Sequence, residues 1–564
     1  MSVYKSKRWL DHYDRHVPEY LDYPDTTVPQ ALKETAQRHP QHPVMIFKGR
    51  RISYREFDDA VDRFAAALQG LGVKKGDRVA VHLPNCPQFP IAYNSILRCG
   101  GIVVPCNPTY KPREMLHQIN DSGAEIIVTL SAMYPIIKQI RADTPLREVI
   151  VARIKAYFPG LTKLLFTLFL EKKSGHRVDI GGDPNTHWFN HLLSSAPATP
   201  RPVEIDSGDT AVLMYTGGTT GVSKGAQLTH RNILVNAYQV LAWIKAEEGK
   251  EVCLVAIPLF HSYGMTCGMN TAALVANTGI LIPDPRDLDD VLESIHKYRP
   301  TLYPGVPAMY VAINNHPDVQ RYDLSSLRIC NSGAAPLPPE VQQRFQQLTG
   351  ARLIEGYGLS EATPVTHTNP AYGEDRIGSI GLPYPDTEVK IVDSELGEQE
   401  MAVGELGEMC IRGPQVMKGY WNMPTETANA LRNHHDGGGP WLHTGDLAYM
   451  DRDGYFHIAD RKKDMILGAG GYNVYPREIE DVLFEYPKVL EAAAVGVPVE
   501  GKGERVKVFV VLKHGETATK DEILAFCKDN LAPYKVPRYV EFRDELPKTL
   551  VGKVLRRALR DQEL

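Results

Sequence analysis

The most informative stretch of the sequence is Tyr215-Thr-Gly-Gly-Thr-Thr-Gly-Val-Ser-Lys-Gly225. Its glycines permit backbone conformations in which successive N–H groups point into one concavity. Its hydroxyl side chains add hydrogen-bond donors, and Lys224 adds a positive charge. A loop of this composition suits the binding of a polyphosphate. It is not a Walker P-loop, because no Gly-Lys-Ser/Thr sequence closes it.

The residues around this loop indicate how it is held. The apolar runs Ala211–Met214 and Ala226–Leu228 favour two flanking strands and argue against a flexible linker. Gly221–Gly225 also matches the G-x-S-x-G pattern of hydrolases, which needs a strand directly before it and a helix directly after it. Here Thr216–Thr220 precede the pattern and a strand-like run follows, so a hydrolase with Ser223 as nucleophile is the weakest alternative.

Helix-like and strand-like runs alternate along most of the chain. Helical spacing over Glu56–Leu71 is followed by a buried strand at Arg78–Leu83, and the same order recurs through Val128. The rhythm returns at Asp290–Lys297 and Glu340–Leu348. Repeated β-α units predict an α/β fold with parallel sheets covered by helices.

The C-terminal part of the chain has a different pattern of predicted elements, which is typical of an α+β domain. A helix-like run at Pro476–Phe484 is followed by strand-like runs such as Val506–Leu512. The charged segment Asp460–Asp464 lies between the two structured parts and is our candidate domain boundary. We therefore predict an N-terminal body over residues 1–461 and a C-terminal domain over residues 462–564.

Composition excludes several classes of protein. The chain has 564 residues, with 63 Lys+Arg against 68 Asp+Glu and a formal charge of −5, so it lacks the basic footprint of a protein that binds a nucleic-acid polymer. Its eight cysteines form no C-x-x-C pair and no Cys/His cluster with zinc-ligand spacing. A reducing, cytoplasmic compartment is the expectation. The N-terminus lacks the apolar core of a signal peptide, and no uncharged apolar run reaches the roughly 20 residues that cross a bilayer.

Four further motifs carry chemistry. In Glu355–Thr363, Gly356 and Gly358 flank an aromatic ring suited to stacking on a base, and the following Ser360 and Glu361 offer oxygen ligands for Mg²⁺. Each motif is modest alone, since Gly-Asp, for example, is most often a turn. The remaining three motifs are Trp441–Leu447, Asp460–Glu480 and Leu546–Arg556.

In this order and spacing, the five motifs resemble those of the adenylate-forming superfamily of acyl-CoA synthetases, adenylation domains and luciferases. The resemblance spans Asp25 to Arg557 and includes Ile257–Gly264 and Asn331–Leu337. It implies a large N-terminal body of two layered α/β subdomains plus a small β-barrel-like subdomain, followed by a small mobile α+β C-terminal domain. It also implies that a carboxylate is activated with ATP·Mg²⁺ to an acyl-adenylate and then passed to coenzyme A.

The resemblance also implies a role for each matching residue. The phosphates would be bound by Thr216, Gly217, Gly218, Thr219, Thr220 and Lys224. Adenine would be held by Gly333, Ala334, Ala335 and Tyr357 between Gly356 and Gly358, and ribose by Asp446 and Arg461. Ser360 would serve phosphate, and Glu361 and Thr216 would serve the metal.

The same resemblance implies a mobile C-terminal domain. Lys553 would bridge the carboxylate and the α-phosphate during adenylation. Lys463 matches a hinge, about which Lys553 would leave and Gly470 and Gly471 would enter beside the pantetheine tunnel. His261 would gate the carboxylate site.

The prediction of the substrate begins from the absence of a carboxylate in the segment Phe260–Tyr263. Relatives that bind small amino acids carry an Asp where this chain has Phe260–Tyr263, so an α-amino group has no evident partner. The length and motifs of the chain most resemble those of bacterial long-chain fatty-acid–CoA ligases. An aryl- or medium-chain acid–CoA ligase, a fatty-acyl-AMP ligase that loads a carrier protein, and a non-catalytic nucleotide-binding relative are the alternatives.

A segment outside these motifs points to a membrane. Ala156–Leu170 is mostly apolar but is broken by Pro159, Gly160 and Lys163, and it has Lys155 and Lys172-Lys173 at its ends. Such a segment suits peripheral contact with the inner face of a membrane, near a supply of fatty acid. The alternatives are a surface helix packed on its own core and a mobile insertion. A homodimer is also expected from the relatives, without an interface signal in this sequence.

Overall fold

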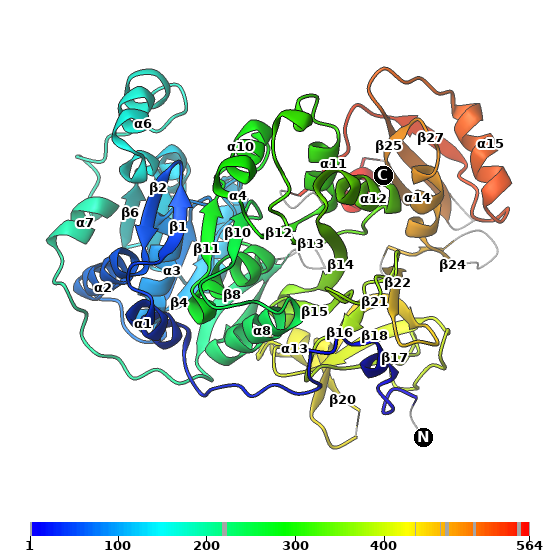
Figure 1. Cartoon of the computed structure of the whole chain (residues 1–564), viewed down its shortest axis with the longest axis horizontal. Coiled ribbons are helices and arrows are strands. Elements are labelled where there is room, and N and C mark those ends of the chain that lie inside the picture. Colours follow the sequence, from blue (N-terminus) through cyan, green and yellow to red (C-terminus); the bar gives the residue numbers. More distant parts are fainter. Residues whose placement is uncertain are drawn as a thin grey trace.

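The computed structural model describes residues 3–216, 223–434, 436–462, 464–467, 473–499, 504–549 and 554–562. The chain forms a large body built on three sheets, followed by a small C-terminal domain that is drawn in orange and red in Figure 1. This arrangement confirms the predicted α/β fold class.

The first sheet of the body contains the two strands that flank the predicted phosphate loop. Its inner strands pair in parallel, whereas β9 runs antiparallel to β8 and β19 antiparallel to β9. The inner strands are mostly apolar and almost wholly buried, as parallel strands covered on both faces are. In spatial order the strands are β19 (Gly419–Tyr420), β9 (Lys224–Thr229), β8 (Thr210–Thr216), β4 (Ile102–Pro105), β3 (Arg78–His82), β5 (Ile126–Leu130), β6 (Glu148–Ala152) and β7 (Thr186–Trp188).

The second sheet carries the segments with the predicted adenine residues, and Ser360 and Glu361 follow one of its strands. It is parallel through its centre, with antiparallel strands at both edges. In spatial order its strands are β16 (Leu382–Pro383), β15 (Val365–Thr368), β14 (Arg352–Gly358), β13 (Ile329–Ser332), β12 (Leu302–Gly305), β10 (Val252–Val255), β11 (Thr278–Leu281), β1 (Pro43–Phe47) and β2 (Arg50–Ser53).

The third sheet is antiparallel and fits the small barrel-like subdomain that the resemblance implies. Its strands are β17 (Glu388–Val392), β18 (Gly407–Arg412), β21 (Pro440–Met450), β20 (Leu431–Asn433) and β22 (Phe456–Arg461). Because β21 pairs with β18, β20 and β22, this long strand is the spine of the sheet.

The C-terminal domain has its own core. Its strands are β23 (Ile466–Leu467), β24 (Asn473–Val474), β25 (Val489–Pro498), β26 (Glu504–Leu512) and β27 (Tyr539–Phe542), and its helices are α14 (Pro476–Phe484), α15 (Lys520–Asn530) and α16 (Arg556–Arg560). Ile466, Ile479 and Val508 belong to one buried cluster. The last strand of the body ends at Arg461 and the first strand here begins at Ile466, a placement that agrees with the predicted boundary but does not test it.

Helices cover the sheets. In the body they are α1 (Val28–Arg38), α2 (Tyr54–Gly70), α3 (Gln88–Arg98), α4 (Pro112–Ser122), α5 (Tyr134–Ile140), α7 (Phe189–Ser195), α8 (His230–Trp243), α9 (Ala272–Val275), α10 (Leu288–Tyr298), α11 (Pro307–Asn314), α12 (Pro339–Thr349) and α13 (Pro424–Ala430). Of these, α2, α10 and α12 lie where the sequence predicts helical runs over residues 56–71, 290–297 and 340–348. Local chemistry sets the helix ends. Ser53 and Glu56 form a capping box at the start of α2, and Gly123 ends α4 with a φ of 63°.

The apolar segment that suggested membrane contact projects from the body at α6 (Gly160–Leu165), which continues as a π-helical turn over Phe166–Leu170 (Figure 1). Pro159 lies directly before α6, so the break falls at the helix start. Across the described residues, no helix is both long and apolar enough to cross a membrane.

Candidate active site

The phosphate-loop candidate is held between two paired strands, as predicted. Thr216 at the end of β8 faces Lys224 at the start of β9. The Ser223 hydroxyl donates to the Thr216 carbonyl oxygen at 2.8 Å, and the next residue already belongs to a strand. This geometry removes the hydrolase alternative, because the elbow would require a helix at that point. Gly217, Gly218, Thr219 and Thr220 lie outside the described residues.

Lys224 is buried and contacts polar side chains that are themselves partly exposed. Its ammonium is ion-paired with Glu426 and lies 5.3 Å from the centre of the Tyr420 ring. The Tyr420 hydroxyl donates to Oε1 of Glu361 at 2.8 Å. The short strand β19 places Tyr420 beside Lys224, because β19 pairs with β9. Tyr420 therefore joins the predicted phosphate lysine to the predicted metal carboxylate.

Tyr420 and Glu426 are residues that the sequence analysis missed. Tyr420 follows Gly419 at an edge strand, and Glu426 lies in the first turn of α13. Neither position carries a pattern of its own in the sequence. Only the pairing of β19 with β9 shows that they belong to the site.

A tight turn presents Ser360 and Glu361. The turn Ser360–Ala362 follows β14. A side chain at Gly358 would place its Cβ 2.2 Å from the Pro364 carbonyl oxygen, so the turn requires glycine there. The Met417 N–H donates to the Glu361 carbonyl oxygen at 2.7 Å, which fixes the main chain of the metal-ligand candidate.

The predicted adenine residues leave two neighbouring parallel strands at the same edge. Ser332 on β13 is opposite Glu355 on β14, so residues 333–335 emerge beside residues 356–358. Ala334 has a φ of 68°, a left-handed turn that redirects the chain at this edge. The carboxyl ends of parallel strands are where α/β sheets bind ligands. The structure thus brings together two segments that the sequence separates.

The predicted ribose residues form one contact network. The Tyr357 hydroxyl donates to Oδ2 of Asp446 at 2.5 Å, and Nε of Arg461 lies 3.2 Å from Oδ1 of the same carboxylate. Asp446 is buried. Burial and the Asp446 charge hold the pKa of Tyr357 well above its usual range, so its hydroxyl remains a donor. The charge of Asp446 also raises the pKa of Arg461.

His261 lies beside the metal-ligand turn. It ends a turn in which its N–H donates to the Pro258 carbonyl oxygen at 3.1 Å. The Tyr263 N–H donates to His261 Nδ1 at 3.3 Å, so the neutral ring carries its proton on Nε2. The next residue, Ser262, has its hydroxyl oxygen 3.2 Å from that of Ser360. The predicted gate is therefore adjacent to the predicted phosphate and metal residues.

Comparison with known proteins identifies the family. The sequence model of the AMP-binding enzyme family matches residues 32–421, and that of the AMP-binding enzyme C-terminal domain matches residues 478–553. The chain belongs to the AMP-binding enzyme family. The residues of the first match include the phosphate loop, the adenine segments and Glu361.

Relatives of this AMP-binding enzyme are similar over their whole length. The chain is 45% identical to the long-chain-fatty-acid–CoA ligase of Bacillus subtilis (strain 168), over 99% of this chain and 98% of that protein. It is 42% identical to the ligase of the same name from Escherichia coli O157:H7, with the same coverage. The match therefore includes the C-terminal domain as well as the body.

Solved structures share the fold. The anthranilate CoA ligase AuaEII in complex with anthranoyl-AMP has a TM-score of 0.83 at 27% identity, covering 96% of this chain and 98% of its own. The fatty acyl CoA synthetase of Mycobacterium tuberculosis has a TM-score of 0.71 at 28% identity, covering 95% of this chain and 98% of its own. The likeness thus covers nearly the whole chain.

The C-terminal domain of this AMP-binding enzyme contacts the body through Asp460. The Arg477 N–H donates to Oδ2 of Asp460 at 2.9 Å, and Nη1 of Arg477 donates to the Ile458 carbonyl oxygen at 2.7 Å. Arg556 lies 3.7 Å from Oδ1 of Asp460 and pairs with Glu480. Lys463, Gly470, Gly471 and Lys553 lie outside the described residues, so their predicted roles stay predictions.

Proposed function

We propose that the protein is a long-chain-fatty-acid–CoA ligase of the AMP-forming type. The acid's carboxylate attacks the α-phosphate of ATP, forming acyl-AMP and releasing pyrophosphate. The thiol of coenzyme A then attacks the acyl carbon, forming acyl-CoA and releasing AMP. The observation that carries this proposal is the full-length similarity to bacterial ligases of that name. Two contact networks support it: one of Lys224, Tyr420 and Glu361, and one of Tyr357, Asp446 and Arg461.

The described residues suit an adenylate. Asp446 can accept hydrogen bonds from ribose hydroxyls while Arg461 balances its charge. The anthranilate CoA ligase with the same fold was solved with anthranoyl-AMP, an acyl-adenylate, which supports placing the same class of intermediate here. Carboxylate and phosphate repel each other, so the cleft must offset negative charge in the transition state. Lys224 and Lys553 are the cations proposed for that task.

Mg²⁺ is proposed to accompany ATP. Glu361 offers a carboxylate that already accepts a hydrogen bond from Tyr420, and Thr216 offers a hydroxyl, so the donor set is oxygen only and fits a hard cation. When bound, the ion supplies positive charge to the phosphates. Glu361 would be oriented for it by Tyr420, which is the part of this arrangement that belongs to the chain itself.

Domain alternation is proposed to separate the two steps. The boundary would lie between Arg461 and Lys462, with Lys463 as the hinge. In the first step Lys553 would bridge carboxylate and α-phosphate. In the second step Gly470 and Gly471 would replace it beside the pantetheine. The Asp460 contacts with Arg477 and Arg556 are the interactions that such a rotation would have to remake.

A long-chain acid is favoured over the alternatives by the full-length similarity to bacterial ligases whose names specify that substrate class. The segment Phe260–Tyr263 carries no carboxylate that would bind an α-amino group. A shorter or aryl acid, and a carrier protein in place of coenzyme A, remain the outcomes that the assay below distinguishes.

The test is a two-step assay of the purified protein with ATP, Mg²⁺ and acids of increasing chain length, with and without coenzyme A. We expect pyrophosphate with long-chain acids and thioester only when coenzyme A is present. Pyrophosphate without thioester would indicate a carrier-dependent ligase. Absence of pyrophosphate with every acid would reject adenylation, and the non-catalytic relative would then be favoured.

Lys553→Ala gives this assay its internal control. It should abolish adenylation and leave thioester formation from supplied acyl-AMP intact. Lys548→Ala is the matched variant, because Lys548 lies in the same segment and is paired with Glu491. It should retain both steps. Full adenylation by Lys553→Ala would show that another group bridges the reactants.

We also propose peripheral membrane contact through residues 156–173. Leu161, Leu168 and Phe169 are 71%, 65% and 70% exposed, so the surface-helix alternative does not account for them. Lys163, Lys172 and Lys173 are exposed beside them and suit anionic lipid. Lys155, a predicted flank, is instead paired with Glu171 at 2.6 Å and is not available for that role.

Liposome cosedimentation tests this contact. We expect wild-type protein to sediment with vesicles that contain anionic lipid, and the triple variant Leu161→Asn, Leu168→Asn, Phe169→Asn to remain in solution. Leu396→Asn is the matched control, since Leu396 is 74% exposed on another part of the body. Equal sedimentation of the triple variant would end the proposal. A cytoplasmic location at the inner membrane face, and a homodimer, stay predictions; light scattering tests the latter.

A further inference from the structure

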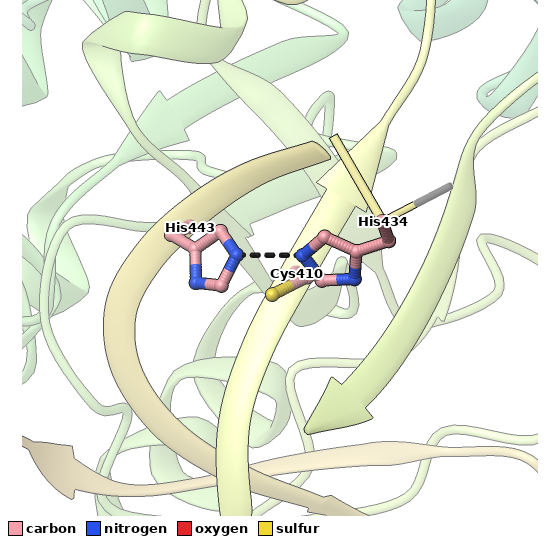
Figure 2. Close-up of side chains that lie close together, drawn as sticks. All are labelled: Cys410, His434 and His443. Atoms are coloured by element: carbon pink, nitrogen blue, oxygen red, sulfur yellow. Dashed lines mark hydrogen bonds between the residues drawn. The ribbon is translucent and has the colours of Figure 1, made fainter. Parts of the chain in front are cut away.

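Three metal-ligand side chains meet in the third sheet, away from the adenylate residues. Among the residues that the structure describes, Cys410, His434 and His443 place one ligand atom each within 4.8 Å of one another. Figure 2 shows the two imidazole rings facing each other with the cysteine sulfur beside them. Their sequence spacing matches no zinc motif, and strand pairing creates the cluster.

The strands explain the meeting. Cys410 on β18 is the direct cross-strand neighbour of His443 on β21. His434 directly follows β20, which pairs with β21 on the other side. Strand neighbours on one face approach closely enough for their side chains to share a ligand. Three separate segments thus converge on one point.

The arrangement of the two histidines leaves a need for a further partner. Their Nε2 atoms lie 2.8 Å apart, so a single N–H···N bond satisfies both. Nδ1 of His434 and Nδ1 of His443 are both buried without a hydrogen-bond partner. Oε2 of Glu408 lies 3.5 Å from Nδ1 of His443, on the side opposite the cluster. A carboxylate behind a histidine is the usual support of a metal-binding imidazole, because it orients the free Nε2 toward the ion.

The ligand set indicates the ion. Two imidazoles and a thiolate suit Zn²⁺ better than a hard cation. Zinc distances of about 2.0–2.1 Å to nitrogen and 2.3 Å to sulfur separate tetrahedral ligands by roughly 3.3–3.6 Å. The two Nε2 atoms lie 2.8 Å apart, which is below this range, so the imidazole rings would have to move apart slightly to admit the ion. Cys410 and His443 are buried whereas His434 is half-buried, which leaves a path from solvent.

We propose that Cys410, His434 and His443 bind one Zn²⁺ ion, which fastens the end of β20 to β18 and leaves the remaining coordination position to water. Glu408 connects this zinc site to the predicted nucleotide site. Its Oε1 accepts from the Gly445 N–H at 3.1 Å, directly before Asp446. The ion would thus hold the strand that carries the ribose carboxylate. This site serves structure and is independent of the acyl chemistry.

The nearby cations do not prevent such a site. Nζ of Lys390 lies 3.8 Å from Asp436 and 3.9 Å from Glu400, so its charge is offset. Nζ of Lys462 lies 3.5 Å from Glu408. Cys410 would bind as a thiolate, so its proton would leave as the ion binds.

The experiment uses the untagged full-length chain after chelation and dialysis. Zinc content is measured after equilibration with limiting Zn²⁺, and Co²⁺ is then added as a spectroscopic substitute. We expect one zinc per chain, a thiolate-to-cobalt charge-transfer band in the near ultraviolet, and a higher unfolding temperature with zinc than without it. Cys410→Ser should lose the charge-transfer band, and His434→Gln should weaken zinc affinity at least about 10-fold.

Controls separate binding from folding. His457→Gln changes a histidine of the neighbouring strand that is paired with Asp451, and it should keep the band and the stoichiometry. His434→Gln alters a half-buried side chain, so it tests the site even if Cys410→Ser fails to fold. No charge-transfer band in the wild type, or unchanged zinc binding and zinc-dependent unfolding temperature in His434→Gln, would overturn the proposal.

Discussion

Asp446 and Arg461 are opposite neighbours on β21 and β22, with Nε of the arginine 3.2 Å from Oδ1 of the carboxylate. Tyr357 of the second sheet donates to the other oxygen of Asp446. The carboxylate thus connects two sheets of the body at the point where the predicted ribose and adenine residues meet. Because Arg461 ends the body's last strand, the same pair also lies next to the predicted hinge.

Asp446→Asn tests this connection. The amide keeps the shape but loses the charge that pairs with Arg461, so we expect kcat/KM for ATP to fall about 10- to 100-fold, the range of a charged hydrogen bond. Steady-state kinetics at varied ATP measure it. Asp453→Asn, which alters an exposed partner of Arg376, should leave kcat/KM unchanged. An unaltered value in Asp446→Asn would remove this carboxylate from nucleotide binding.

Tyr420→Phe tests the link between Tyr420 and Glu361. The substitution removes the donor to Oε1 of Glu361 but keeps the ring beside Lys224. We expect the Mg²⁺ concentration for half-maximal adenylation to rise about 10-fold, as loss of a ligand's supporting bond commonly causes. Tyr539→Phe, at an exposed tyrosine, is the control. If both variants required the same Mg²⁺ concentration, the assignment of Glu361 as the metal ligand would be wrong.

Glu426→Gln tests competition for Lys224. Glu426 neutralises the lysine that is predicted to bind phosphate, so its removal should strengthen ATP binding. We expect KM for ATP to fall about threefold, in line with the roughly 0.7 kcal/mol of a partly exposed ion pair. A higher KM would mean instead that Glu426 positions Lys224 for the nucleotide.

Glu355→Gln tests a buried carboxyl at the edge of the second sheet. Burial raises the pKa of Glu355 from 4.5 to about 7, partly offset by Arg477. The folded state therefore favours the protonated form of Glu355. The contribution of this group to the free energy of unfolding is full below pH 4.5 and is lost as the pH rises through 7. This rise in the pKa of Glu355 corresponds to at most about 3 kcal/mol in the free energy of unfolding.

We therefore expect the Gln variant to be more stable than wild type at pH 8 and similar at pH 4.5. Thermal unfolding across this pH range measures the difference. Glu293→Gln, at an exposed position on α10, should follow wild type. A stability difference that does not change with pH would show that Glu355 is ionised throughout.

Lys463→Pro tests the hinge. Proline fixes φ and removes the N–H, so rotation at this position should be blocked. We expect the thioester step to slow at least about 10-fold, the scale on which hinge changes alter turnover, whereas adenylation is retained. Lys463→Ala keeps backbone freedom and serves as the control. Single-turnover rates of both steps distinguish the variants, and unchanged rates in the proline variant would move the hinge elsewhere.

The motif residues were predictable because each motif is contiguous. The loop before Lys224 could be placed between strands from the apolar runs at its ends, and β8 and β9 confirm it. The helix at Pro476–Phe484 was predictable from its 3.6-residue periodicity. Tyr420 and Glu426 were not predictable, since their role depends on an edge strand of two residues. Short edge strands carry too few residues for a periodic pattern.

By itself, the sequence determined the chemistry that this chain can offer: a phosphate loop, an oxygen ligand at Glu361 and a ribose carboxylate at Asp446. The tertiary structure alone decided which of these groups meet. Tyr357 contacts Asp446 across 89 positions of the chain, and Lys224 contacts Glu426 across 202. It also gathered Cys410, His434 and His443, which no spacing rule connects. The physical reason is that contacts between strands depend on strand order and register, whereas a motif records only neighbours along the chain.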